Sequence, residues 1–420
     1  MRTTTSFAGR VSRPWSNVRR PDGFDAAAAT EAEAYAVLEE QVMEGRRGAA
    51  RLTEIVAVAL AMAGASLSCA SGKGTTADDS PIKASKTLGT THGPNGEKAT
   101  PTSALKLTSS EVAKVRAGHH TAALVWHQNS DFVTAVTAGA RDEFEQLGIE
   151  VVAETSANFD SAKQKADVET VEAKKPSVLL TLPVDPVATA SAYQAAAKQG
   201  TKIVLLSVVP QGMARGRDYV NVVTDDLFQM GKRAADALAA AVGGSGTIAY
   251  FFRDANSYVA NQRDQAFLKT LTANYPDVKV VAKQGIADPN QAQDQANAIL
   301  LKNPDLSGAY VTFAQPPAEG VLASLRANGN TRTKLVSLDL DEPLALDMAR
   351  GGNTFALIAD KAYELGQAMA KSAAYGLLGK KAPAFVVAPA MTITKSNLVQ
   401  GYHDSLHRDP PASVMKALGK

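Results

Sequence analysis

The sequence predicts an α/β protein built from two doubly wound lobes with parallel sheets, and three observations support this fold class. The chain has 420 residues, which is more than one hydrophobic core usually organises. Its composition of 45% hydrophobic and 20% charged residues is typical of globular proteins. From residue 122 onward, short apolar runs alternate with amphipathic stretches. Strands that are buried on both faces and separated by helices predict parallel sheets with right-handed crossovers.

The first part of the chain is typical of an export signal. An apolar run, IVAVALAMAGA at 55–65, follows three arginines and is shorter than the roughly 20 residues that a transmembrane helix needs. A basic flank, a short apolar run and small residues predict a signal peptide over 43–69. We expect Met43 to be the true start, with 1–42 a disordered, over-long gene start.

The only cysteine of the chain, Cys69, directly follows this signal. A single cysteine excludes a disulfide framework and a multi-thiolate zinc site. The placement resembles a bacterial lipoprotein signal, in which this cysteine is lipidated. Leu67 lies two residues before Cys69, whereas the lipoprotein pattern has Leu three before it. The alternative is a core cysteine in a buried helix.

Residues 70–108 are rich in Ser, Thr, Gly, Lys, Asp and Pro. A segment with so few large apolar residues cannot bury enough surface to offset its ordering entropy, so we expect a flexible tether. The tether would join the signal region to a folded body.

The folded body is predicted element by element from its hydrophobic pattern. Apolar runs predict buried strands at 122–126, 149–153, 178–182, 203–206, 248–252, 278–282, 309–311, 335–338 and 355–358. Amphipathic stretches predict helices at 133–147, 161–175, 187–199, 260–274 and 290–301. The strand-like segment 219–225 is interpreted as the first crossing between the lobes. The predicted lobes are 109–224 with 361–389, and 225–360 with 390–420.

Charge and motif content exclude several function classes. The 44 Lys and Arg against 42 Asp and Glu give a net charge of +2, which provides no basic surface for nucleic acid or for coating a membrane. We find no nucleophile elbow, dinucleotide fingerprint or acid/base dyad, so no catalytic residue and no cofactor is predicted. Asp339 and Asp341 resemble a fragment of a calcium loop without its continuation, and His403 and His407 lack a third ligand. No metal site is predicted.

Candidate ligand contacts follow the predicted strands, because ligands of doubly wound sheets bind at the carboxyl ends of strands. Hydrogen-bonding side chains are interleaved there with aromatic ones, which suits a small polyhydroxyl ligand. The predicted contacts are Trp126, Asn129, Ser130, Phe132, Ser207, Asn256, Tyr258, Arg263, Gln315, Asp339 and Asp360. The plainer alternatives are a core role for Trp126 and a surface helix charge for Arg263.

From about residue 106 to the end, the chain resembles the type I solute-binding proteins of bacterial ABC sugar importers, the ribose-binding-like family. The matching segments are ALVWHQNSDFVTAVTAGARDEFEQLGIEV, LTLPVDPVATASAYQAAAKQGTKIVLL, ANSYVANQRDQAF, LVSLDLDEP and FALIADKAYELG. The resemblance implies two Rossmann-like lobes joined by three crossovers, with a sugar held between them. It also implies that Trp126, Ser130 and Phe132 match first-strand contacts, Arg263 the ligand-binding arginine, and Asp339 a ligand-binding carboxylate.

Departures from the family pattern bear on the ligand. Ser207-Val208 stands where ribose-binding relatives have Asp-Arg, Ala314-Gln315 where they have Asn-Asp, and Asp360 where Gln is usual. We therefore expect a sugar other than ribose, or a polyol. The implied partners are the permease subunits of an ABC importer, and a monomer is expected.

Other functions remain open from the sequence alone. A binding protein coupled to a receptor would contain the same residues, and an α/β enzyme acting on a sugar could share the fold. A ligand-sensing regulator of the lac-repressor kind would need a helix-turn-helix in place of the export signal. The expected location is extracytoplasmic, anchored to the cell membrane as a lipoprotein, with a free periplasmic or secreted form as alternative.

Overall fold

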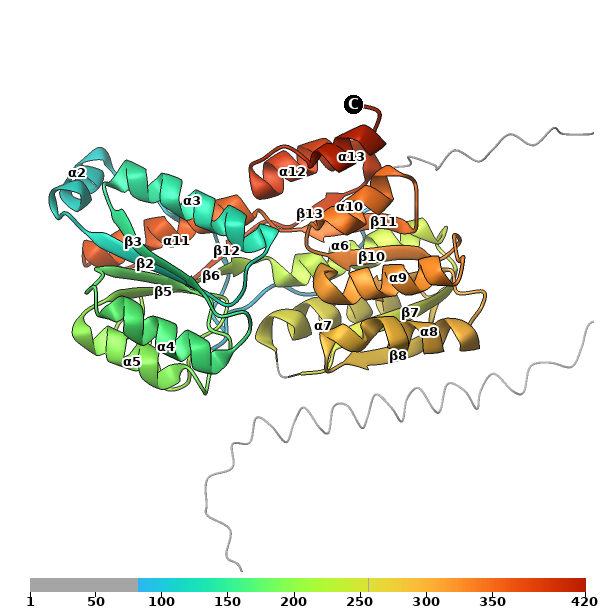
Figure 1. The fold of residues 1–420 in the computed structure, drawn as a ribbon, viewed down its shortest axis with the longest axis horizontal. Helices are drawn as coiled ribbons and strands as arrows, with labels where there is room; N and C mark the ends of the chain where they lie inside the picture. The colour runs from blue at the N-terminus through green and yellow to red at the C-terminus, as the bar shows by residue number, and fades with distance from the viewer. Residues whose placement is uncertain (1–81, 256) are drawn as a thin grey trace, which may run out of the picture. The chain divides into compact units, whose positions relative to one another are not determined.

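The computed structural model describes residues 82–255 and 257–420, which form two α/β sheets flanked by helices (Figure 1). Each sheet has apolar side chains on both faces. In the first sheet, Leu124 packs with one set of helices and Val125 with the opposite set. In the second sheet, Phe251 and Tyr250 alternate in the same way. The two lobes are therefore doubly wound, as the alternation of strands and helices predicts.

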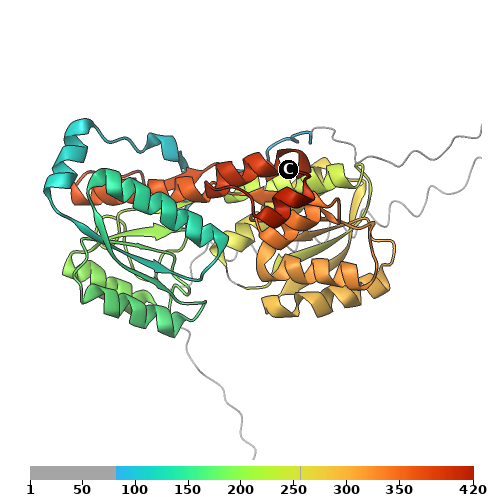
Figure 2. The same ribbon diagram turned by 45° about the horizontal axis from the view of Figure 1, so that its top comes forward.

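The first sheet has seven strands, and its described pairs are all parallel. In spatial order they are β1 (Thr100–Pro101), β12 (Phe385–Ala388), β6 (Val222–Asp225), β5 (Lys202–Leu206), β4 (Val178–Thr181), β2 (Thr121–Trp126) and β3 (Glu150–Ser156). Its helices are α2 (Ser109–Ala117), α3 (Asp131–Leu147), α4 (Ser161–Glu172), α5 (Ala190–Gln199) and α11 (Ala362–Leu377). Helices α3 and α11 lie side by side (Figure 2).

The second sheet has six strands, with only its edge strand β13 antiparallel among the described pairs. In spatial order they are β13 (Met391–Ile393), β11 (Thr354–Ala359), β10 (Lys334–Leu338), β9 (Gly308–Val311), β7 (Gly246–Arg253) and β8 (Val278–Ile286). The helices of this part are α6 (Leu227–Ala241), α7 (Tyr258–Asn274), α8 (Ala292–Lys302), α9 (Glu319–Ala327), α10 (Glu342–Ala349), α12 (Leu398–Leu406) and α13 (Ala412–Ala417). Short helical turns occupy Thr102–Ala104, Pro289–Gln291, Ala314–Ala318 and Lys395–Asn397.

The chain passes between the two sheets through three connections in the described body. It leaves the first sheet between β6 and α6, returns between β11 and α11, and leaves again between β12 and β13. The strand-like segment 219–225 contains β6, whose last residue is Asp225. The residues at these connections are therefore the ones that lie between the two sheets.

Local signals explain where the helices next to the connections begin and how closely they pack. The Ser130 hydroxyl accepts a hydrogen bond from the backbone N–H of Val133 and caps α3, and Gly148 ends that helix with a φ of 65°. Gly231 lets α6 approach α7, because a Cβ at this position would lie 2.0 Å from the carbonyl oxygen of Arg263. This close packing fixes the position of the Arg263 turn.

Each predicted apolar run overlaps a strand of the structure, from β2 to β11, and the predicted helices overlap α3, α4, α5, α7 and α8. The prediction omitted three short edge or near-edge strands, β1, β12 and β13. β1 and β13 have only two and three residues, which is too few for a hydrophobic period to stand out, and β12 has four.

The described part of the predicted tether differs from the expectation of a flexible segment. From residue 82 it contacts the folded body, with Thr91 bonded to Asp226 and β1 paired with β12. These contacts are hydrogen bonds to helix ends and to a sheet edge, and they cannot be predicted from the hydrophobicity of the sequence. The remainder of the predicted tether, the signal peptide and Cys69 lie outside the described residues.

Candidate ligand-binding site

Arg263 occupies the centre of the candidate site, in the second turn of α7, and is 7% exposed. Its Nη1 lies 3.2 Å from Asp339 Oδ1, and its Nη2 lies 3.4 Å from Asp225 Oδ2. Asp339 follows β10 of the second sheet, whereas Asp225 ends β6 of the first. One guanidinium thus joins carboxylates from both sheets.

Asp339 adopts an unusual backbone conformation, with a φ of 71°. A non-glycine residue in the left-handed region is uncommon and costs free energy, which the surrounding contacts must offset. The carboxylate of Asp339 is 30% exposed, so it is the solvent-accessible partner of Arg263. This carboxylate is free to accept further hydrogen bonds.

Asp360, directly after β11, adds a third carboxyl group to the Arg263 cluster, which we define as Asp225, Arg263, Asp339 and Asp360. Burial, followed by the charges of Asp225 and Asp339, raises the pKa of Asp360 well above its usual range. Its Oδ2 is buried without a hydrogen-bond partner among the described residues. The protonated form that these conditions favour offers an O–H donor.

Burial also raises the pKa of Asp225 to about 6, while the positive charge of Arg263 opposes this effect. Asp225 was not among the predicted contacts. The sequence contains a signal for it, because Asp225 is the last residue of the strand-like segment 219–225, which we interpret as a crossing between the lobes.

Three of the predicted contacts on the first lobe have clear local roles. Ser130 caps α3, and the Ser207 hydroxyl lies 2.7 Å from that of Thr224 on the neighbouring strand. Trp126, at the end of β2, is 1% exposed and packs in the core. Its indole Nε1 nevertheless has no hydrogen-bond partner among the described residues. Trp126 was predicted as a ligand contact with a core role as the alternative, and in the structure it combines a core position with an unused donor.

The other predicted contacts form no hydrogen bond or ion pair with the Arg263 cluster in the described structure. Asn129 and Gln315 are exposed, and Phe132 is half-buried against the first core. The Tyr258 hydroxyl donates to the carbonyl oxygen of His92, a contact that the sequence did not indicate. Asn256 lies outside the described residues.

A buried histidine also follows β2 and was not selected from the sequence. Burial lowers the pKa of His127 to about 4, so it is neutral at physiological pH. Its ring packs edge-on against Phe159 at 5.3 Å, and its Nδ1 has no partner in the described part of the chain. His127 thus offers a neutral hydrogen-bonding atom next to Trp126.

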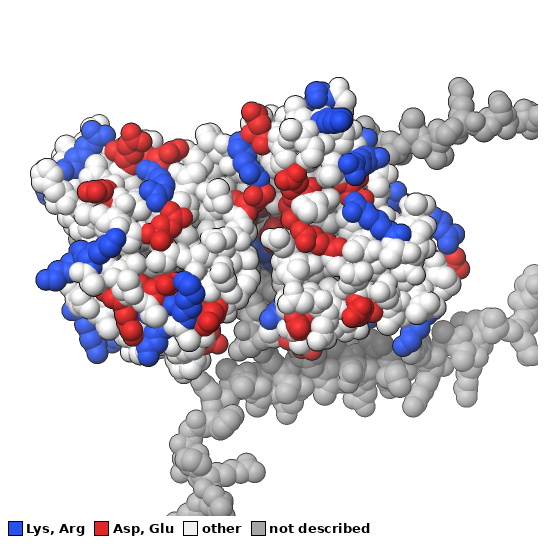
Figure 3. All heavy atoms as spheres, viewed as in Figure 1, with Lys and Arg blue, Asp and Glu red and all other residues white. Residues whose placement is uncertain are grey.

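Acidic side chains gather along the boundary between the lobes (Figure 3). Asp341 follows Asp339 by two residues and caps α10 by accepting from the N–H of Leu344. Burial, then Glu319 and Asp131, raises the pKa of Asp341 to about 7. Asp131 in turn pairs with Arg408 at 2.5 Å. The boundary is therefore richer in carboxyl groups than in cations at these positions.

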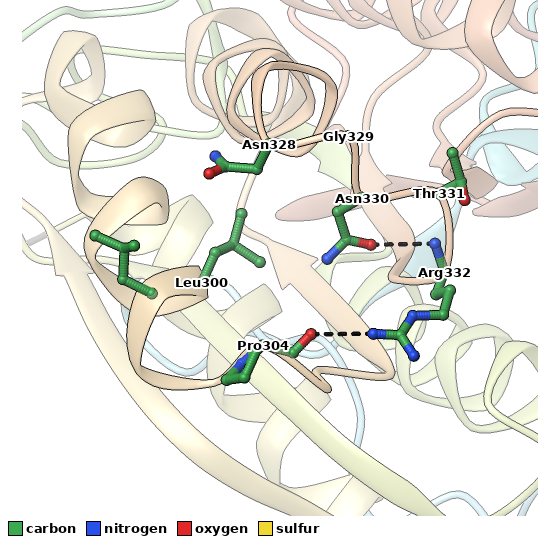
Figure 4. Close-up of a pocket in the computed structure, with 8 residues that line it drawn as sticks. Leu300, Pro304, Asn328, Gly329, Asn330, Thr331 and Arg332 are labelled. Atoms are coloured by element: carbon green, nitrogen blue, oxygen red, sulfur yellow. Dashed lines mark hydrogen bonds between the residues drawn. The ribbon is translucent and has the colours of Figure 1, made fainter.

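Two surface cavities lie away from the candidate site. One, of about 420 Å³, is lined by residues at the ends of α8 and α9, including Leu300, Asn330 and Arg332 (Figure 4). The other, of about 470 Å³, includes Lys202 and Tyr219. Both lie at the amino ends of strands, whereas ligands of such sheets bind at the carboxyl ends.

Comparison with known families agrees with this architecture. Residues 122–381 match the family model of the periplasmic binding protein domain. The chain belongs to this family. The match covers more than half of the chain and includes most strands of both sheets, but not β1, β12 and β13.

Individual relatives of this periplasmic binding protein are distant in sequence. The ribose import binding protein of Salmonella typhimurium is 24% identical over 286 residues, which cover 68% of this chain and 94% of the relative. A solute-binding protein of Agrobacterium vitis, bound with α-D-tagatopyranose, aligns with a TM-score of 0.59 at 23% identity, over 66% and 96% of the two chains. Another from the same species, with bound allitol, gives 0.57 at 22% identity, over 68% and 98%. These structures share the fold.

Proposed function

We propose that this protein is an extracytoplasmic solute-binding protein that delivers a small carbohydrate or polyol to an ABC importer, without altering it chemically. The observation that carries the proposal is the Arg263 cluster, which joins carboxylates of both sheets at the carboxyl ends of their strands. Membership of the periplasmic binding protein family supports the location and the importer partner. The relatives named above bind or import a sugar or a polyol.

The proposed ligand contacts use complementary hydrogen-bonding groups. Asp339 would accept from a ligand hydroxyl, and Arg263 would donate through its Nε, which has no partner among the described residues. Asp360 would donate through its protonated carboxyl group, because burial favours that form. A neutral polyhydroxyl compound provides both donors and acceptors and so fits this set.

The first lobe would supply mainly the apolar side of the site. We propose that Trp126 and Phe132 pack on the C–H face of the ligand, and that Trp126 Nε1 donates to it. Ser207 is held by Thr224, so its hydroxyl is shared with the neighbouring strand. Ser207-Val208 stands where ribose-binding relatives have Asp-Arg. We therefore propose that the ligand is a sugar other than ribose, or a polyol.

A binding screen tests the proposed function. Thermal unfolding should be measured with ribose, D-tagatose, allitol, other pentoses and hexoses, and inositols. A ligand at a hundredfold excess over its Kd stabilises the folded state by about 2.7 kcal/mol, which raises Tm by several degrees. Amino acids and nucleosides serve as controls. The proposal would be contradicted if an amino acid or a nucleoside bound to the protein and no carbohydrate or polyol did.

We further propose that lipidation of Cys69 anchors the protein to the cell membrane. In the described part of the chain, no helix has the length and apolar character to cross a bilayer. Cell fractionation should show loss of membrane association for Cys69→Ala, because this cysteine is the residue that would carry the lipid. A variant that stays in the membrane fraction as fully as the wild type would contradict lipid anchoring.

A further inference from the structure

Residues 85–102, called the strap below, contact the second lobe and then the first before the family match begins at residue 122. We propose that the strap is a fourth connection between the lobes, which positions the start of α7 and responds to ligand binding. This inference rests on the proposed function, because it concerns the site that contains Arg263. It adds positioning residues that lie outside the matched family region.

The first attachment of the strap is to the start of α6. The Thr91 hydroxyl donates to Asp226 Oδ1 and accepts from the N–H of Phe228 at 2.8 Å. Asp226 is also the cap of α6, since the same oxygen accepts from the N–H of Gln229. Thr91 is only 3% exposed. The strap is thus built into the helix cap that directly follows the first chain crossing.

The second attachment is to the first turns of α7. The N–H of His92 donates to Gln262 Oε1 at 3.4 Å, and Gln262 Nε2 donates to the carbonyl oxygen of His92 at 3.2 Å. The Tyr258 hydroxyl donates to the same carbonyl oxygen. Gln262 directly precedes Arg263. The strap therefore holds the helix segment that carries the central cation of the candidate site.

The third attachment is to the first lobe. Thr100 and Pro101 form β1, which pairs in parallel with Val386 and Val387 of β12. The Thr102 hydroxyl then donates to the carboxylate of Glu364 in the first turn of α11. These bonds fasten the far end of the strap to the sheet that contains Asp225.

A tight turn lies between the attachments to the two lobes. The N–H of Gly93 donates to the carbonyl oxygen of Glu97 at 2.8 Å, and Gly96 has a φ of 79°, which glycine adopts without strain. Because both ends of the strap are fastened, a rotation of one lobe against the other must alter this turn or one of its attachments. Ligand binding that favours one arrangement of the lobes would then change how well the strap is protected.

Hydrogen exchange on the full-length protein tests the strap. Exchange should be measured with and without D-tagatose, allitol and any other compound that binds in the thermal screen. We expect bound ligand to change exchange over residues 92–102 at least about threefold. A purely structural role would leave the strap equally protected in both states. Binding accompanied by unchanged exchange would overturn the inference and leave the proposed function intact.

Two variants test the attachments separately. Thr91→Val keeps the shape of the side chain and removes both of its hydrogen bonds, and Thr102→Val removes the bond to Glu364. Each should speed exchange of the strap and weaken ligand binding by about three- to tenfold, as expected for one or two lost hydrogen bonds. Thr87→Val is the control, because Thr87 is exposed and forms no hydrogen bond in the described structure.

The outcomes separate the two proposals. Wild-type exchange and affinity in both variants would show that the strap does not position the site. If no compound of the screen binds, the proposed function fails and the inference fails with it. Altered exchange and weakened binding in Thr91→Val, with Thr87→Val unchanged, would support both.

Discussion

The two halves of the candidate site differ in how their polar groups are held. On the second lobe, Arg263 and Asp339 form an ion pair that reaches across to Asp225 on the first sheet. On the first lobe, Ser207 and Ser130 bond within their own lobe, while Trp126 is buried among apolar side chains. The charged groups of the candidate site are therefore concentrated around α7 and the chain crossings.

This difference shows which groups are available to a ligand. In the charged half, the side chains are held in place before a ligand binds. The reason is that the two partners of a buried ion pair fix the direction of each other's donors and acceptors. The neutral half offers a large apolar surface and a few unpartnered atoms, such as Trp126 Nε1 and His127 Nδ1. Substitutions should therefore weaken binding far more in the charged half.

The largest effect is expected from Arg263→Ala. This change leaves Asp225 and Asp339 without their cation, and unpaired buried charges cost about 3–5 kcal/mol. Affinity measured by calorimetric titration should fall at least about a hundredfold, with a lower Tm. The matched control is Arg141→Ala. Arg141 lies on α3 and pairs with Glu154, and the side chains of Arg141 and Glu154 are 46% and 40% exposed. Equal affinities in the two variants would remove Arg263 from the site.

Asp339→Ala should have the next largest effect. It leaves Arg263 with Asp225 alone and removes the exposed acceptor, so affinity should fall at least about thirtyfold, as loss of one partner of a buried charged pair costs about 2–5 kcal/mol. Asp305→Ala is the control, since Asp305 pairs with Arg332 on the surface and its side chain is 87% exposed. Near-wild-type affinity of a folded Asp339→Ala protein would contradict its proposed role.

Asp360→Asn tests the charge balance of the cluster through pH. Because the folded-state pKa of Asp360 is raised, the folded chain binds this proton more tightly than the unfolded chain does. The resulting stability is present below the usual Asp pKa of about 4 and is lost as pH rises toward the folded-state pKa, by up to about 1.4 kcal/mol per pH unit. The variant lacks this contribution.

Between pH 4 and 7, the Tm of the wild type should therefore fall more, or rise less, than that of Asp360→Asn. Asp225, with a pKa of about 6, contributes in the same direction to both proteins. Parallel Tm curves for the two proteins would show that Asp360 titrates normally. If Asp360 contacts a ligand hydroxyl, the variant should also change which sugar or polyol is preferred, because an amide replaces the acid.

The smallest effect is expected from Trp126→Phe on the neutral half. If Trp126 Nε1 donates to the ligand, its loss should weaken binding by about three- to tenfold, the equivalent of one hydrogen bond. Tyr193→Phe is the contrast, because the Tyr193 hydroxyl is buried and bonded to Thr181 on the opposite face of the first sheet. It should lower Tm without changing affinity. Unchanged affinity in Trp126→Phe would assign Trp126 to the core alone.

The sequence predicts the main elements of the fold well, because each depends on short-range patterns. The run at 122–126 lies within β2, and the amphipathic stretch 133–147 lies within α3, capped by Ser130 and ended by Gly148. Arg263, Asp339 and Asp360, which were selected because they follow predicted strands, are brought together by the structure. Whether they bind ligand stays a prediction.

The strap and Asp225 show which features of the structure short-range sequence patterns cannot predict. Thr91 and Asp226 are 135 positions apart, and a polar segment is stabilised there by hydrogen bonds to a helix cap. Tyr258 was selected as a ligand contact, yet its hydroxyl bonds to His92, which is 166 positions away. Composition alone predicted a flexible tether at 70–108, because composition reflects the burial of apolar side chains and not the hydrogen bonds that a sheet edge or a helix end offers.

The sequence by itself determined the alternation of strands and helices and the residues at the carboxyl ends of the strands, since hydrophobic period and capping act over a few residues. Only the tertiary structure decided that Arg263 pairs with Asp225, 38 positions away, and with Asp339, 76 positions away. Ion-pair geometry depends on how the two sheets and α7 pack against one another. Burial, which raises the pKa of Asp225 and Asp360, is likewise a property of that packing and of no local segment.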